Sequence, residues 1–224
     1  MFSHTKGLIM QENTDITKKI MDRINSYPEG EIFYIQKFLD FGDYDSIKAI
    51  LARLESSGLI RRMVRGVYEK PVYNSMLGEL VEPNPQKVAK ALAEKNGWMI
   101  APSGETALNY LGISTQVPNT WEFISSGPSR EYELKNAKLI FTHREDREFT
   151  ALSPKTIMTA QALRAIGQER ITKEMIANFA AHFDQAEREK MLAEGNNLPL
   201  WIYNCLKEIA SADVIDGSSD KSHA

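Results

Sequence analysis

Residues 32–70 contain the sequence pattern that most constrains the fold of this chain. A short helical segment at residues 35–39 is followed by a turn, and a longer helix is predicted from residue 44 to about residue 57. Asp43 precedes this helix in the N-cap position, and Gly58 follows it where a left-handed residue is tolerated. Apolar residues recur at the spacing of one buried helical face, and they are Ile47, Ile50, Leu51 and Leu54.

A β-hairpin is predicted directly after this helix. Two β-rich runs, at residues 59–64 and 67–70, flank Arg65-Gly66, and a two-residue turn that ends in glycine is typical of hairpins. An earlier helix with isoleucines every four residues, Ile16 to Ile24, supplies a third helix for the same core. The order helix, turn, helix, hairpin indicates a winged helix-turn-helix.

The buried face of the longer helix determines which residues remain available for DNA. In helix-turn-helix proteins the N-terminal end of the second helix enters the major groove, and a hairpin wing contacts the sugar-phosphate backbone or the minor groove. Residues 44–70 contain six Lys/Arg and three Asp/Glu, a local charge of +3 in a chain of net charge −3. The candidate DNA contacts are Tyr44, Ser46, Lys48, Arg53, Arg61, Arg62 and Arg65. The alternative is an ordinary solvated hairpin on a domain that binds protein.

The fold class expected for the whole chain is α+β, with two domains. Residues 1–75 form the winged helix-turn-helix, residues 76–215 a larger mixed α/β domain that ends in helices, and residues 216–224 a flexible tail. Two nearby prolines, Pro83 and Pro85, discourage regular structure and indicate the joint.

The second domain is predicted to alternate helices and strands before it becomes helical. Ser153 and Pro154 mark a helix start, and Asp184 with Glu187 is a capping-box pattern. The expected strands are 98–101, 121–126, 132–134 and 138–143. The expected helices are 86–96, 106–111 and 155–166, with three more that start at Thr172, Asp184 and Pro199.

Composition points to a cytoplasmic protein without a metal or cofactor site. The single cysteine, Cys205, excludes an internal disulfide framework, and no apolar run is long enough to span a bilayer. The glycines do not match a phosphate-binding loop, the four histidines are far apart, and His143 lies in a charged segment that is expected to be a solvated turn. We therefore expect no catalytic residue.

Two alternative functions remain open at this stage. Glu133 and Lys135 have the E-x-K spacing of Mg²⁺-dependent nucleases, where Glu122 would be the further acidic residue required. A protein-binding adaptor would instead use exposed aromatic residues, and its candidates are Trp121, Trp201 and Tyr203. Their apolar neighbours favour a place in the core for all three.

The chain resembles AbiEi-type antitoxins of type IV toxin–antitoxin systems, over roughly residues 14–210. The resemblance rests on RGVY at residues 65–68, SGETALNYLG at 103–112, STQVP at 114–118 and SPK at 153–155. It implies a bacterial transcriptional repressor and antitoxin, of a kind associated with phage defence, that regulates its own operon. Its winged helix would bind inverted repeats in its own promoter, with two copies of the chain per operator.

The resemblance also implies a functional counterpart, a nucleotidyltransferase-like toxin encoded by the neighbouring gene. The larger C-terminal domain would contribute to repression and would counter the toxin without forming a stable complex with it. No catalytic residue is implied, and the helix and hairpin residues named above are those expected to contact double-stranded DNA.

Overall fold

A computed structural model describes residues 15–212, which form the expected α+β fold in two compact units. The first unit contains the described residues up to Trp98 together with Tyr132–Ala137, and the second contains Met99–Glu131 and the described residues from Lys138 onward. The boundary predicted after residue 75 therefore lies inside the first unit. The flexible tail predicted at residues 216–224 lies outside the described residues.

The first unit contains the predicted helices and hairpin in the predicted order, together with a strand before the short helix that was not predicted. A helix at residues 15–26 comes first. The elements after it are β1 (Ile32–Tyr34), the short 3-10 helix η1 (Ile35–Phe38), α2 (Tyr44–Ser56), β2 (Arg61–Val64) and β3 (Val67–Glu69). The three strands form an antiparallel sheet in the order β1-β3-β2.

Helix α2 has the ends and the buried face that its sequence predicts. An Oδ1 atom of Asp43 accepts hydrogen bonds at 3.0 Å from the backbone nitrogens of both Asp45 and Ser46, and Gly58 has a φ of +77°. The four predicted apolar residues of α2 are all buried and pack in one cluster with the first helix and the sheet. This packing leaves the opposite face of α2 in solvent.

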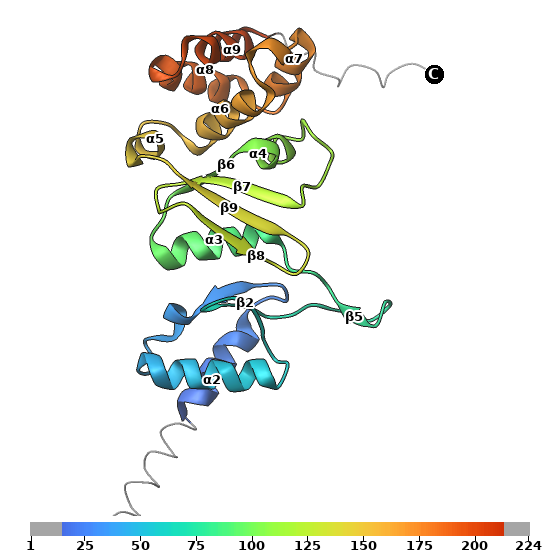
Figure 1. The fold of residues 1–224 in the computed structure, drawn as a ribbon, viewed down its shortest axis with the longest axis vertical. Coiled ribbons are helices and arrows are strands. Elements are labelled where there is room, and N and C mark those ends of the chain that lie inside the picture. Colours follow the sequence, from blue (N-terminus) through green and yellow to red (C-terminus); the bar gives the residue numbers. More distant parts are fainter. Residues whose placement is uncertain (1–14, 213–224) are drawn as a thin grey trace, which may run out of the picture. The chain divides into compact units, whose positions relative to one another are not determined.

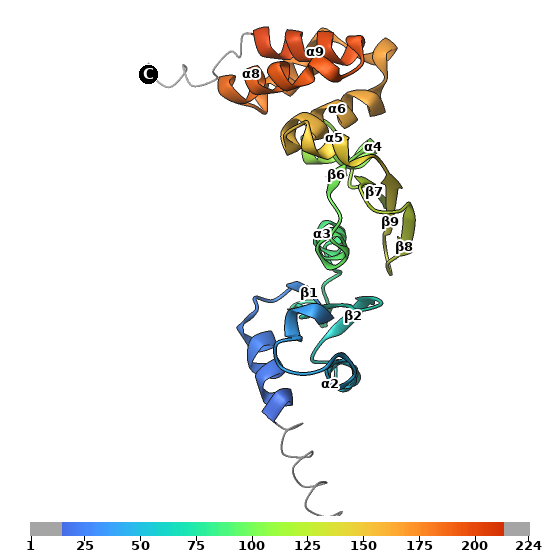
Figure 2. The ribbon, with the colours of Figure 1, turned by 90° about the vertical axis from the view of Figure 1, so that its left-hand side faces the viewer.

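The small sheet is covered on both faces, because its side chains alternate. Phe33 and Tyr68 belong to the cluster formed with the first helix and α2. Val67 and Glu69 alternate with Tyr68 along β3 and are also buried. Helix α3 (Pro85–Asn96) contacts β1 and β3 from the side opposite α2, as Figure 2 shows.

Helix α3 was predicted to belong to the second domain, and this prediction is wrong. It contacts β1 and β3 of the first unit, and its lysines bind backbone carbonyls there: Lys87 Nζ donates to Gly30 at 3.2 Å and Lys95 Nζ donates to Arg65 at 2.6 Å. Pro85 occupies the first position of this helix, where proline is favoured. The proline pair therefore starts a helix of the first unit and does not separate two domains.

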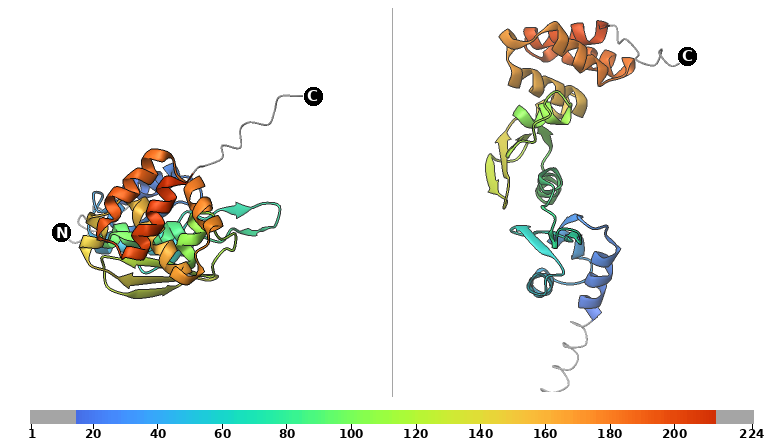
Figure 3. Two further views of the ribbon diagram at one scale, coloured as in Figure 1. Left: turned by 90° about the horizontal axis from the view of Figure 1, so that it is seen from above. Right: turned by 90° about the vertical axis from the view of Figure 1, so that its right-hand side faces the viewer.

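A second hairpin, absent from the sequence prediction, lies between β3 and α3. Its strands are β4 (Tyr73–Asn74) and β5 (Glu79–Leu80), and it projects from its unit in Figure 3. The Asn74 side chain accepts hydrogen bonds from the backbone nitrogens of Met76 and Leu77, which stabilises the turn. Met76 at its tip is 94% exposed.

The second unit contains a mixed four-stranded sheet, apart from Tyr132 and Glu133 at the end of one strand, which belong to the first unit. Its strands are β6 (Ile100–Pro102), β7 (Thr120–Ser125), β8 (Arg130–Glu133) and β9 (Lys138–His143), in the spatial order β6-β7-β9-β8. Strands β7 and β9 are parallel and β6 is antiparallel to β7. Helices α4 (Gly104–Tyr110) and α6 (Pro154–Ile166) lie on one side of this sheet (Figure 1). All four strands overlap segments predicted from the sequence.

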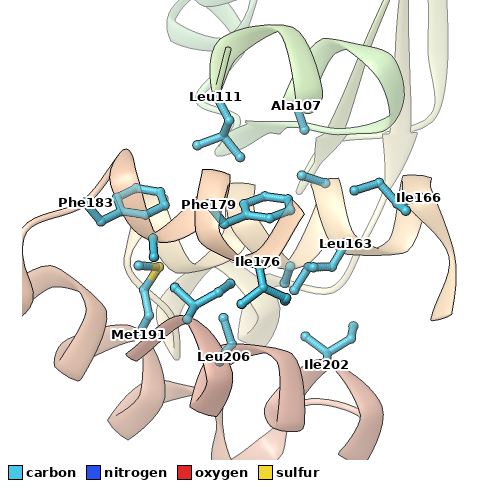
Figure 4. Close-up of a cluster of buried hydrophobic side chains, with 14 of the residues drawn as sticks. Ala107, Leu111, Leu163, Ile166, Ile176, Phe179, Phe183, Met191, Ile202 and Leu206 are labelled. Carbon is cyan, nitrogen blue, oxygen red and sulfur yellow. The ribbon is translucent and has the colours of Figure 1, made fainter. Parts of the chain in front are cut away.

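The helical part of the second unit encloses the larger core. Its further elements are α5 (Asp146–Thr150), η2 (Gln168–Arg170), α7 (Lys173–Ala181), α8 (Gln185–Glu194), η3 (Gly195–Asn197) and α9 (Leu200–Ser211). Figure 4 shows Leu163, Phe179, Met191 and Leu206 of this core, contributed by α6, α7, α8 and α9 in turn. Helix α5 was not predicted, because its charged sequence was interpreted as a solvated turn.

The predicted helix starts in this unit are correct in position, and one of them, at Ser153, differs in its bonding. The capping box of Asp184 and Glu187 is present in full. Ser153 precedes α6 as predicted, but its hydroxyl bonds with that of Thr156 at 2.9 Å and not with a backbone nitrogen. Instead, the carboxylate of Glu194 accepts hydrogen bonds from Ser153 N at 2.8 Å and from Thr156 Oγ1 at 2.5 Å.

We expect Glu194→Gln to destabilise the protein at neutral pH and to have little effect in acid. Burial disfavours the charged carboxylate, but hydrogen bonds from Thr156 and Ser153 outweigh burial and lower the pKa of Glu194. A lowered pKa stabilises the fold above the usual carboxyl range, and this contribution is lost as pH falls through the folded-state pKa. Urea unfolding at pH 7 should show a loss of about 1 kcal/mol or more, absent near pH 3. An equal loss at both pH values would contradict this account.

Candidate nucleic-acid interface

The solvent-facing side of α2 holds four of the predicted contact residues. Lys48 and Arg53 are exposed, Tyr44 is 48% exposed and Ser46 is half-buried. The exposed residues between the two cations include alanines 49 and 52. Their short side chains would let another molecule approach the helix backbone closely while Lys48 and Arg53 reach past them.

Ser46 has a structural role that limits its use as a contact. Its backbone nitrogen donates to Asp43, and Ser46 lowers the pKa of that carboxyl through hydrogen bonding. Asp43 therefore stays ionised as the cap of α2. Together with Asp45 in the first turn, it places negative charge at the start of the helix. Cationic contact with a phosphate must consequently come from Lys48 onward and from the hairpin.

The three hairpin arginines do not form the single cluster that the sequence predicts. Arg61 and Arg62 are neighbours on β2, so their side chains leave opposite faces of the sheet. Arg62 is paired with Tyr68 in the strand register, and Arg61 is paired with Glu69. Only Arg62 is therefore on the same side of the sheet as α2.

Arg61 is committed to an ion pair with a buried carboxylate, which corrects its assignment as a DNA contact. Its Nε and an Nη atom donate to Oε2 of Glu69 at 2.8 and 2.5 Å, and the same Nη atom donates to the carbonyl of Val81 at 2.8 Å. Glu69 is 2% exposed, whereas the Arg61 side chain is 22% exposed. Arg61 thus fixes the hairpin to the chain that follows it.

Arg62 lies close to the ring of Tyr68. Burial raises the pKa of Tyr68, the positive charge of Arg62 opposes that shift, and Glu55 and Tyr44 add to it. Arg62, Glu55 and Tyr44 therefore each act on the Tyr68 ring, which packs in the same cluster as α2. Arg62 is exposed on the face of the sheet that carries Tyr68.

Arg65 is exposed at the hairpin turn, whose backbone is anchored on both sides. Its carbonyl accepts the hydrogen bond from Lys95 of α3, and the carbonyl of Gly66 accepts one from the backbone nitrogen of Ile35 at 3.2 Å. Gly66 has a φ of +75°, which suits glycine at this turn. Lys95 adds a second cation at the turn, and sequence reasoning missed it because α3 was assigned to the other domain.

Four cations remain exposed on this part of the chain, and we call Lys48, Arg53, Arg62 and Arg65 the basic surface. Among the described residues, none of the four forms an ion pair. Lys70 does not belong to this surface, because its Nζ donates to the carbonyls of Asn25 and Tyr27 at 3.0 and 2.6 Å. Lys48, Arg53, Arg62 and Arg65 can therefore contact phosphates or base edges without first breaking an ion pair.

The residues considered for a nuclease do not form the expected arrangement. Strand β8 ends at Glu133, so Lys135 lies beyond the strand and forms an ion pair with Glu82 at 2.9 Å. Glu133 and Lys135 are therefore not alternate residues of one strand. Within residues 15–212, no group of three or more His, Cys, Asp or Glu side chains could hold a metal ion.

Of the aromatic residues considered for a protein-binding surface, the two tryptophans are part of the core or pack against it, and Tyr203 is half-buried. Trp121 is buried on β7, and Trp201 packs against the helical core. Cys205 also packs against that core, and burial raises the pKa of its thiol. None of the helices in the described part of the chain is long and apolar enough to cross a membrane.

The fold and the basic surface define an α+β protein with a small helix-and-hairpin unit at its N-terminal end. A model of a family described as of unknown function, DUF6088, matches residues 19–192, and the chain belongs to this family. The crystal structure of the RV2827C protein from Mycobacterium tuberculosis is similar, with a TM-score of 0.49 and 11% sequence identity. That similarity covers 89% of this chain and 76% of the other. No curated protein matches the sequence.

Proposed function

We propose that this protein is a cytoplasmic DNA-binding transcriptional repressor whose N-terminal unit acts as a winged helix-turn-helix. The observation that carries the proposal is the basic surface, where Lys48 and Arg53 of α2 and Arg62 of the hairpin are all exposed and outside any ion pair of the described chain. The buried stripe of α2 fixes the orientation of this surface. In helix-turn-helix proteins such a face enters the major groove.

The number of available cations favours binding by two copies. Six basic residues lie between positions 44 and 70. Arg61 forms an ion pair and Lys70 binds backbone carbonyls within the protein, so four basic residues remain available for DNA. Asp45 and Glu55 of α2 reduce the local charge further. Two copies on an inverted repeat would double the phosphate contacts and steepen the dependence of affinity on salt. The DNA proposed is an inverted repeat in the protein's own promoter.

The resemblance to AbiEi-type antitoxins supports the second part of the proposal, which is autoregulation within a type IV toxin–antitoxin pair. The toxin would be a nucleotidyltransferase-like protein encoded by the adjacent gene. The C-terminal unit would counter it without a stable complex. No catalytic step by this chain is part of the proposal.

A reporter driven by the gene's own promoter tests the proposed function in cells. We expect the wild-type chain to repress the reporter several-fold and to restore growth to cells that express the adjacent toxin gene. A variant with Lys48→Ala and Arg62→Ala should lose repression, because both replaced side chains belong to the basic surface. An unchanged reporter with wild-type protein present would contradict the repressor proposal, and failure to restore growth would contradict the antitoxin proposal.

A further inference from the structure

A cavity of about 520 Å³ lies within the second unit, among α5, the middle of α6 and the end of η3. Its polar lining comes from Arg147, Gln161, Arg164 and Asn197. The remaining lining is apolar and includes Leu152, Ile157 and Leu198. Its volume is within the range of small-molecule sites, which combine an apolar wall with a few polar groups.

Gln161 is the most informative residue of this cavity. It is 7% exposed, and its amide makes no hydrogen bond within the described chain. The Nε atom of Arg188 is the one fully enclosed side-chain polar atom without a partner among residues 15–212, so the Gln161 amide is not sealed in the core. Gln161 therefore lines the cavity and has an amide that is neither bonded within the described chain nor fully enclosed.

The other buried polar residues of α6 have partners, which sets Gln161 apart. Thr156 donates to Glu194, and Thr159 donates to the sulfur of Met191 at 3.4 Å. An amide left without a partner in a largely buried position costs free energy relative to an apolar side chain. A ligand that forms hydrogen bonds with the Gln161 amide would remove this free-energy cost.

The charged and apolar residues specify the chemistry of that ligand. Arg164 follows Gln161 by three positions on α6, so both side chains lie on one side of the helix. Arg147 lines the same cavity, and its ion pair with Glu145 is at the surface, where such pairs are weak. Two guanidinium groups suit an anion such as a phosphate, and the planar amides of Gln161 and Asn197 suit the donor–acceptor edge of a base.

We propose that this cavity binds a nucleotide. The amides of Gln161 and Asn197 contact the base edge, the side chains of Leu152 and Ile157 contact the base face, and Arg147 and Arg164 contact the phosphate. All the residues of this site belong to the second unit.

Isothermal titration calorimetry on the full chain tests this proposal with AMP, GMP, CMP and UMP, and with inorganic phosphate and the free nucleosides as partial ligands. We expect at least one nucleotide to bind with a Kd below 1 mM and at least tenfold more tightly than phosphate or its nucleoside. Gln161→Met and Arg147→Gln should each weaken that binding about tenfold or more. Lys173→Gln, which removes an exposed charge from α7 in the same unit, should leave the binding unchanged.

A thermal melt of the unliganded variants separates a binding role of Gln161 from a structural one. If the amide serves a ligand, Gln161→Met should keep or raise the melting temperature, since it replaces an amide without a partner by an apolar side chain of similar size. Absence of nucleotide binding at millimolar concentration would overturn the proposal. It would also be overturned if phosphate bound as tightly as the nucleotides, or if folded Gln161→Met bound them like the wild type.

Discussion

Replacement of Arg61 by alanine is expected to lower the free energy of unfolding of the N-terminal unit by about 3–5 kcal/mol, because it leaves a buried carboxylate without its partner. The affected carboxylate is that of Glu69, which is 2% exposed and receives two hydrogen bonds from Arg61. Removal of Arg61 also frees the Val81 carbonyl and loosens the chain after the hairpin. Hydrogen exchange of the β3 amides measures this free energy in the intact chain.

The loss of unfolding free energy caused by Arg61→Ala should become smaller as the pH is lowered. Burial raises the pKa of Glu69, and Arg61 opposes that shift, so removal of Arg61 should raise the pKa further. A carboxyl whose folded-state pKa is raised favours the fold most at low pH, and this contribution is lost as pH rises through that pKa. The variant should therefore recover stability relative to the wild type between pH 7.5 and pH 5.

Two further variants serve as controls for the predicted effect of Arg61→Ala on stability. Arg62→Ala removes a neighbouring but exposed arginine and should change the free energy of unfolding by less than about 0.5 kcal/mol. The double variant Arg61→Met/Glu69→Leu removes both charges and should be much more stable than Arg61→Ala alone, since buried ion pairs replaced by apolar residues often cost little. A loss for Arg61→Ala that equals the loss for Arg62→Ala would contradict the structural role assigned to Arg61.

The second large effect that we expect is a loss of affinity for DNA when two residues of the basic surface are replaced. The double variant Lys48→Ala/Arg62→Ala should raise the Kd for the promoter duplex about 30-fold, which corresponds to two contacts of roughly 1 kcal/mol each. Both side chains are exposed, so the fold should be unaffected. Fluorescence anisotropy at several salt concentrations should also show a shallower dependence of affinity on salt, because fewer counterions are released.

The matched control removes the same charge elsewhere. Lys90 of α3 and Lys207 of α9 are exposed and form no ion pair within the described chain. The variant Lys90→Ala/Lys207→Ala should keep wild-type affinity within about twofold, apart from a small effect of net charge. Equal losses in the two double variants would show that net charge, and not the basic surface, determines binding.

The sequence was sufficient to predict those elements that are determined by residues within them or directly beside them. The spacing of Ile47, Ile50, Leu51 and Leu54 predicted α2 and its buried face, and Asp43 and Gly58 marked its ends. Arg65-Gly66 predicted the first hairpin in the same way, because turn geometry depends on the residues of the turn itself. The capping box before α8 is a third local signal that the structure confirms.

Features that depend on tertiary contacts were not predictable. Nothing within α3 indicates that its apolar face packs on β1 and β3, so the domain boundary was placed too early. The role of Arg61 depends on Glu69 and Val81, of which Val81 is 20 positions away. For Gln161, the sequence predicted only the helix in which it lies, because the cavity that it lines is formed by residues of α5, α6 and η3 together.

Site-specific photocrosslinking to the promoter duplex tests the central claim most directly. A photoreactive amino acid would replace Lys48, Arg62 or, as the control, Lys90 in the otherwise unchanged chain. Efficient crosslinks to the DNA are expected from positions 48 and 62 and few from position 90, because only the first two belong to the basic surface. Crosslinks from position 90 alone, or none from positions 48 and 62 while the duplex is bound, would contradict it.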